Sequence, residues 1–301
     1  GTVNGANSLI IAAGTAGDVS FNAVGNSTAL NGLTVTADNI SLGGNVSSTD
    51  LVALHGEVLL GGNVAITAGN TLATGVRFNG GVSGGASTLT VNAAADVNSD
   101  ITAGRLIFNG NVDLSGGSDL TASNNGIAVT GNLVLSGSAS SASTIQGGGN
   151  ALVSLGTVTS SNGQSLTVRS EGDLTLTTVD VGSGSLVAQA DSNNNDTGTA
   201  GANARTLTAT SLQGGTVTLR GGSDGNEIFN IGSVTSTTGT VTINESVRLA
   251  SSLTITSAGA VSLTDAVSST SGSSLTISNA GALTIGGTLA LGGALTQAGG
   301  A

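Results

Sequence analysis

The sequence predicts an all-β fold in which the chain winds into a parallel β-solenoid of roughly 20 residues per coil and about 15 coils. One observation is a phrase that recurs near the end of the chain: Leu253-Thr-Ile-Thr, Leu275-Thr-Ile-Ser and Leu295-Thr-Gln-Ala begin 22 and 20 residues apart. A second is that apolar and polar residues alternate within these phrases, as in half-buried strands. A repeat this short cannot bury its own apolar face, so its copies must stack on one another.

The composition supports the same fold. The 301 residues include 50 Gly and no Pro, Cys, Met, Trp or Tyr. Gly and Asn between the apolar bursts supply the positive-φ corners that a tightly coiled chain requires. Regular Val, Leu and Ile argue against disorder, and the absence of a Gly-x-y triplet argues against collagen. No 3.6-residue periodicity is evident, so we expect no helix.

We expect residues 1–301 to form a single solenoid that is an internal segment of a longer repeat protein. The repeat pattern is already present in the first residues, and the last copy is cut short. Three stretches depart from the pattern because they are rich in Gly, Ser, Asn or Asp and poor in large apolar residues. We therefore predict loops extruded from the coils near 134–150, 190–204 and 221–227.

A Leu-Thr phrase is expected to mark the register along the chain. Its copies are separated by near multiples of about 20 residues, and they begin at Leu33, Leu89, Leu166, Leu207, Leu253, Leu275 and Leu295. All four Phe residues are followed by Asn. This pairing predicts Phe as a core filler and Asn at the next corner, where Asn side chains form a ladder or bond the adjacent coils. The predicted core and ladder residues are Phe21, Asn22, Leu33, Val35, Phe78, Asn79, Phe108, Asn109, Phe229, Asn230, Leu253, Ile255, Leu275 and Ile277.

The sequence offers little for catalysis. His55 is the only histidine, and Glu57 follows it two residues later, on the same side of a strand. No second His and no Cys exists to complete a zinc set, and no nucleophile-elbow sequence surrounds any Ser. We therefore expect a structural role for His55, no catalytic residues and no enzyme activity.

Calcium is the one cofactor for which candidates exist. Asp191, Asp196, Asp224 and Glu227 lie in the predicted loops, and carboxylates are the ligands that calcium prefers. The segment from Gly222 to Glu227 resembles part of a Gly-rich calcium turn. Repeat-in-toxin proteins repeat that turn many times in tandem, whereas this chain has one copy at best. The expectation is therefore no cofactor, with these four residues as the calcium alternative.

Charge and composition also limit the ligands. The net charge is -11, with six Arg and no Lys, so there is no basic stripe for nucleic acid. A carbohydrate-active β-helix enzyme needs carboxylates in one groove and aromatic platforms, but aromatic residues make up 1% of the chain and all are Phe. Ice binding through Thr-x-Thr pairs is a weaker alternative. Asn92, Arg169 and Ser278 stand at the matching outward position in other Leu-Thr phrases, which predicts an irregular ladder.

Several phrases resemble the repeats of filamentous-haemagglutinin-type large exoproteins, which are adhesins exported by two-partner secretion or autotransport. The phrases are Gly17-Asp-Val-Ser-Phe-Asn, Leu33-Thr-Val-Thr-Ala, Ile40-Ser-Leu-Gly-Gly-Asn-Val, Val58-Leu-Leu-Gly-Gly-Asn-Val and Leu253-Thr-Ile-Thr-Ser-Ala-Gly-Ala-Val-Ser-Leu. The resemblance implies a right-handed parallel β-helix, an extracellular or bacterial cell-surface location and an outer-membrane translocator as partner. It carries over no catalytic residues.

Together, these observations favour a structural fibre segment that acts as an adhesin stalk or matrix filament. Its partners are expected to be neighbouring repeats of the same long chain, a glycan, cell-surface or matrix ligand, and further copies if the rods polymerise. The carbohydrate-active enzyme and the ice-binding solenoid remain the alternatives.

Overall fold

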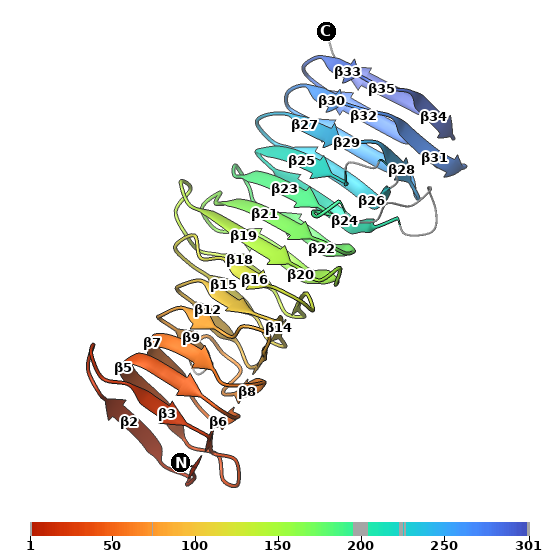
Figure 1. The fold of residues 1–301 in the computed structure, drawn as a ribbon. Coiled ribbons are helices and arrows are strands. Elements are labelled where there is room, and N and C mark those ends of the chain that lie inside the picture. Colours follow the sequence, from red (N-terminus) through yellow and green to blue (C-terminus); the bar gives the residue numbers. More distant parts are fainter. Residues whose placement is uncertain (1, 74, 195–203, 223–224, 226, 300–301) are drawn as a thin grey trace.

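The computed structural model describes residues 2–73, 75–194, 204–222, 225 and 227–299. It confirms the predicted β-solenoid: the described residues form parallel strands and no helix, in about 14 turns of roughly 21 residues. The coils stack into an elongated rod with the two chain ends at opposite tips (Figure 1). With neighbouring strands ~4.8 Å apart, the rod is ~65 Å long. No described segment could cross a membrane as a helix.

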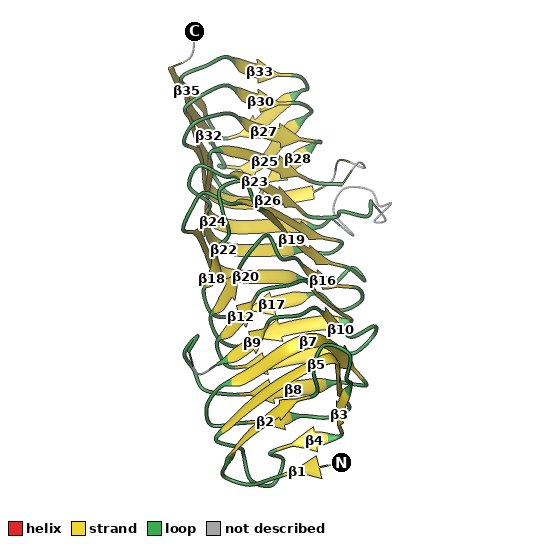
Figure 2. Cartoon of the chain, turned by 90° about the vertical axis from the view of Figure 1, so that its left-hand side faces the viewer, coloured by secondary structure: helices red, strands yellow, loops and turns green. Residues whose placement is uncertain are grey.

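Three stacks of parallel strands form the wall of the rod, and each coil visits them in the order A, B, C (Figure 2). Face A consists of β1 (Thr2–Val3), β4 (Ala23–Val24), β6 (Val46–Ser47), β8 (Val64–Thr67), β11 (Thr88–Asn92), β14 (Arg105–Phe108), β17 (Ile127–Val129), the first parts of β20 (Val153–Ser160), β22 (Leu174–Asp180), β24 (Thr206–Gly214) and β26 (Glu227–Ser236), and β28 (Val247–Leu249), β31 (Val267–Ser271) and β34 (Leu289–Gly292).

The other two faces share several long strands with their neighbours. Face B consists of β2 (Ser8–Ala12), the first parts of β5 (Gly32–Leu42) and β7 (Val52–Leu60), β9 (Val76–Phe78), β12 (Ala95–Val97), β15 (Val112–Leu114), β18 (Leu133–Leu135), the second parts of β20, β22, β24 and β26, and β29 (Leu253–Ser257), β32 (Leu275–Asn279) and β35 (Leu295–Gly299). Face C consists of β3 (Val19–Phe21), the second parts of β5 and β7, and β10 (Val82–Ser83), β13 (Ile101–Ala103), β16 (Leu120–Ala122), β19 (Ala142–Gly147), β21 (Ser165–Ser170), β23 (Ser185–Gln189), β25 (Thr216–Arg220), β27 (Val241–Asn244), β30 (Val261–Leu263) and β33 (Leu283–Ile285).

The interior is one continuous apolar cluster that runs along the rod. Each inward side chain meets its equivalents in the coils before and after it. Phe78, for example, is fully buried between Leu54 and Val97. Phe108 and Phe229 lie in different inward columns of face A and are also fully buried: Phe108 aligns with Val91 and Val129, and Phe229 aligns with Leu207 and Leu249. Burying one such side chain stabilises the fold by about 1.5–3 kcal/mol, so the stack of coils rather than any one coil holds the structure together.

The Leu-Thr phrase does not mark a single register, which corrects the sequence-based expectation. Leu33, Leu253, Leu275 and Leu295 lie on face B. Leu89 and Leu207 lie on face A, and Leu166 lies on face C. The phrase encodes an inward Leu followed by an outward Thr, which suits a strand on any face.

The predicted loop at 134–150 is only partly present. Leu135, Ser143 and Ile145 are buried, and β18 and β19 occupy much of this stretch. The exposed residues are the turn at 138–140, Ala142, and the turn at Gly149 and Asn150. Small residues are sufficient to form a buried strand in this stretch. Ser143 aligns with the inward Leu166 of the next coil, and Gln164 donates a hydrogen bond to the Ser143 Oγ atom at 2.8 Å.

The other two predicted loops are only partly described. In the loop at 190–204, Ala190 and Asp191 are buried and Asn193 and Asn194 are exposed. Residues 195–203 lie outside the described part of the chain. In the loop at 221–227, Gly221 and Gly222 are buried and Glu227 already belongs to β26. Residues 223, 224 and 226 are likewise outside the described part.

Candidate functional site

The structure buries every apolar residue in the predicted core set and exposes every Asn. The buried members are Phe21, Leu33, Val35, Phe78, Phe108, Phe229, Leu253, Ile255, Leu275 and Ile277, all at most 5% exposed. The exposed members are Asn22, Asn79, Asn109 and Asn230. Asn79 and Asn109 directly follow their strands, as the corner prediction requires. Asn230 does not, because it lies inside β26 and points outward from face A.

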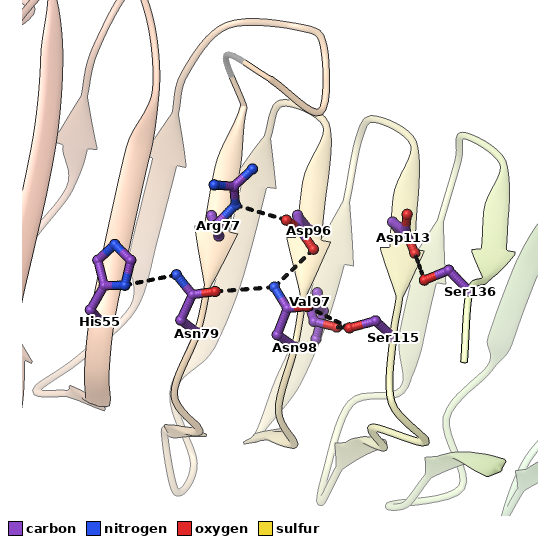
Figure 3. A network of polar contacts seen from close by, with 9 residues as sticks. All are labelled: His55, Arg77, Asn79, Asp96, Val97, Asn98, Asp113, Ser115 and Ser136. Atoms are coloured by element: carbon purple, nitrogen blue, oxygen red, sulfur yellow. Dashed lines mark hydrogen bonds and ion pairs between the residues drawn. The ribbon is translucent and has the colours of Figure 1, made fainter. Parts of the chain in front are cut away.

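A connected row of polar side chains lies on the outside of face B and is shown in Figure 3. Here His55, Asn79, Asn98 and Ser115 follow one another from coil to coil, and we call these four residues the polar ladder. The Asn79 Nδ2 atom lies 2.9 Å from His55 Nδ1, and Asn98 Nδ2 lies 3.2 Å from Asn79 Oδ1. Ser115 Oγ in turn donates to Asn98 Oδ1. Part of the Asn ladder predicted from the Phe-Asn pairs is therefore present.

A second row of outward groups runs beside the polar ladder. Arg77 Nε donates to Asp96 Oδ2 at 2.8 Å, and Asn98 Nδ2 bridges the two rows by donating to Asp96 Oδ1 at 2.9 Å. Further along, Ser136 Oγ donates to an oxygen of Asp113. Asn109 forms a separate amide contact on face A, where its Nδ2 atom donates to Asn92 Oδ1 at 2.7 Å.

An open groove of about 440 Å³ lies at the corner between faces B and C, next to His55. A β-bulge forms this corner, because Ala37 and Asp38 of β5 stand opposite the single residue Gly56 of β7. Gly56 has a φ of 155°, and a Cβ atom there would lie 2.2 Å from the carbonyl oxygen of Ala37. The bulge places His55, Glu57 and Asp38 around the same groove, which the sequence spacing alone did not predict.

The calcium candidates are only partly brought together. Asp191 and Glu227 are both fully buried, and they approach the backbone of Gly222 from adjacent coils. A Cβ atom on Gly222 would lie 2.0 Å from Asp191 Oδ2 and 2.8 Å from Glu227 Oε1. Asp196 and Asp224 lie outside the described residues. Within the described ranges, no three His, Cys, Asp or Glu side chains converge into a metal site.

One carboxyl group on face C has a perturbed protonation equilibrium. Partial burial raises the pKa of Asp119 above its ordinary value of 3.8, and the negative charge of Asp100 acts in the same direction. The backbone N–H of Thr144 donates to Asp119 Oδ1 at 2.6 Å and opposes this rise. Asp119 also links neighbouring coils, because its own N–H donates to Asp100 Oδ1 at 2.9 Å. Its position in the hydrogen-bonded wall indicates a structural role.

Face B also carries a column of hydroxyl side chains along its second half. Thr157, Thr178, Ser211, Ser233, Thr254, Thr276 and Thr296 are aligned in successive coils. We call them the hydroxyl column. All are at least partly exposed. Asn92 and Arg169, which the sequence suggested would interrupt such a column, lie on faces A and C.

Comparisons with known proteins identify no relative: no family model, no curated protein and no solved structure matches this chain.

Proposed function

We propose that this chain is a rigid segment of an extracellular fibre that acts as an adhesin stalk or a matrix filament at a bacterial cell surface. The observation that carries the proposal is the unbroken parallel pairing of strands from the first coil to the last. A rod of this kind resists bending because every coil shares backbone hydrogen bonds and apolar contacts with both neighbours. The resemblance of the repeats to filamentous-haemagglutinin-type exoproteins supports the same role.

The outer surface is consistent with a spacer. It is dominated by Thr, Ser, Asn and scattered carboxylates, and the chain carries a net charge of -11. Such a surface keeps long particles apart in solution. In this proposal the export partner is an outer-membrane translocator, and the binding partners are glycans or matrix components contacted by loops or by other segments of the longer protein. Association between rods would add to matrix building.

The test compares this chain with a flexible linker. The chain is inserted between a surface anchor and a small binding module on bacterial cells, and the height of the module above the cell is measured by super-resolution fluorescence. The matched control is a Gly/Ser linker of the same number of residues, which behaves as a random coil. The proposal predicts a narrow height distribution for the solenoid and a broad one for the linker. Equal widths would reject the stiff-stalk function.

Ice binding is the second candidate, and the hydroxyl column is the observation that favours it. Adjacent outward positions on the same coils add Thr235, Thr256 and Ser278, which gives Ser-x-Thr, Thr-x-Thr and Thr-x-Ser in three successive coils. The rigid wall holds these hydroxyl groups at the ~4.8 Å coil spacing, and a regular array of this kind suits an ordered water lattice.

A thermal-hysteresis assay tests this candidate. Thr256→Tyr would disrupt the array on face B, whereas the matched control Thr242→Tyr changes an outward Thr on face C. Ice binding predicts hysteresis in the unmodified chain and in the control, and its loss in Thr256→Tyr. No hysteresis in the unmodified chain would reject it.

A further inference from the structure

The polar ladder has a fixed direction of hydrogen-bond donation (Figure 3). Asn98 Nδ2 donates to Asn79 Oδ1 at 3.2 Å and to Asp96 Oδ1 at 2.9 Å. Because the oxygen of the Asn79 amide accepts from Asn98, its NH₂ group points the other way, toward His55. The ladder therefore donates step by step from Ser115 to His55.

This direction determines the state of the imidazole ring. Asn79 Nδ2 is a donor and lies 2.9 Å from His55 Nδ1, so Nδ1 must be the acceptor. His55 is then neutral and carries its proton on Nε2. Histidine is the side chain whose charge changes most readily between pH 8 and pH 5. A proton on Nδ1 would place two donors opposite each other, and the contact between His55 and Asn79 would be lost.

The surroundings of His55 provide another partner for the protonated ring. Asp38 from β5 and Glu57 from β7 line the same groove as His55. The charged side chain on the next strand, Arg77 of β9, is held by Asp96. Two carboxylates therefore share the groove with the ring, and Arg77 is the only positive charge on the adjacent strands β5 and β9.

We propose that His55 is a proton-operated switch at the corner between faces B and C. In the neutral state, the ring continues the polar ladder and ties β7 to β9 through side chains. In the protonated state, the ladder ends at Asn79, and the ring turns its positive charge toward Asp38 and Glu57. Acidification thus releases one side-chain tie between neighbouring coils and changes the charge that the groove presents.

Nitrogen-15 NMR of the histidine ring in the full chain tests the first step. His55 is the only histidine, so the ring signals need no assignment. The switch predicts the Nε2–H form at pH 8. It also predicts that the side-chain amide signals of Asn79 shift as the pH falls to 5.5, with the same midpoint as the ring signals. The Asn109 amide, which bonds Asn92 on another face, is the internal control and should not follow this midpoint.

The variant His55→Asn tests the cause. It keeps an acceptor oxygen beside Asn79 but cannot be protonated in this range, so the pH-dependent shift of the Asn79 amide should disappear. Glu57→Gln should leave the Nε2–H form at pH 8 intact. Each of three results would overturn the switch. They are an Nδ1–H form at pH 8, Asn79 amide signals that do not shift when the His55 ring signals shift, and a pH-dependent shift of the Asn79 amide that persists in His55→Asn.

Discussion

Replacing Ile255 tests the inward and outward assignment of an entire face. Ile255 is fully buried in β29, and its neighbours in the adjacent coils are Val234 and Ile277, which are also fully buried. Ile255→Ala removes three heavy atoms from a closed stack. Substitutions of this kind cost about 2–5 kcal/mol, because the cavity adds to the lost transfer free energy. We expect about 3 kcal/mol, since backbone hydrogen bonds to both neighbours limit collapse around the cavity.

The matched control is the next residue on the same strand. Thr256 is exposed, so Thr256→Ala should change stability by no more than about 0.5 kcal/mol. Native-state hydrogen exchange measures both effects locally. For Ile255→Ala, 3 kcal/mol corresponds to amide exchange in β26, β29 and β32 that is faster by on the order of 100-fold.

The location of the effect is as informative as its size. In a solenoid, each coil contacts only its neighbours, so distant strands such as β13 should keep their protection. Equal losses in the two variants would show that the register on face B is wrong. Faster exchange spread evenly over the whole rod would refute the nearest-neighbour reasoning.

Three further predictions concern the corner, an ion pair and a carboxyl group. Gly56→Ala should destabilise the bulge by about 1–3 kcal/mol in chemical denaturation, because its Cβ atom would clash with a carbonyl oxygen; Gly62→Ala, which has no atom within 4 Å of its Cβ position, is the control and should be nearly neutral. Arg77→Ala should cost only about 0.2–1 kcal/mol, and less in high salt, because the pair with Asp96 is partly exposed; a cost unaffected by salt would contradict this. Because the pKa of Asp119 is raised, the folded chain binds that proton more tightly than the unfolded chain, so this group's contribution to the unfolding free energy should fall as the pH rises from about 3.8 through the raised value. Asp119→Asn should remove that part of the pH dependence, and an unchanged pH profile would argue against the raised pKa.

Local alternation made the strands and the core predictable. Leu33, Val35, Leu253 and Ile255 were assigned inward from period-two patterning alone, and all are buried. Coil length was nearly right because Leu253, Leu275 and Leu295 occupy equivalent positions in successive coils. Patterning cannot identify the face on which a strand lies, because an inward Leu followed by an outward Thr is compatible with a strand on any of the three faces.

The candidate site was less predictable because it depends on pairs far apart in the sequence. His55 and Glu57 were visible as neighbours, but the contact between His55 and Asn79 requires the register of adjacent coils. The bulge opposite Gly56 also adds Asp38 to the groove, and nothing in the local sequence specifies it. A useful signal was the Phe-Asn pair at Phe78 and Asn79, which correctly indicated a buried ring followed by a ladder amide.

The central claim is that one continuous stack of coils forms a stiff rod, and a distance between two spin labels tests it most directly. The chain has no native Cys, so Thr34→Cys and Thr256→Cys provide unique attachment sites. The two positions belong to one outward column on face B and are ten coil-to-coil steps apart. Pulsed electron paramagnetic resonance should give a narrow distribution near ~48 Å, because each step adds ~4.8 Å. A broad distribution, or a distance far from this value, would contradict the continuous rod and the stalk function that depends on it.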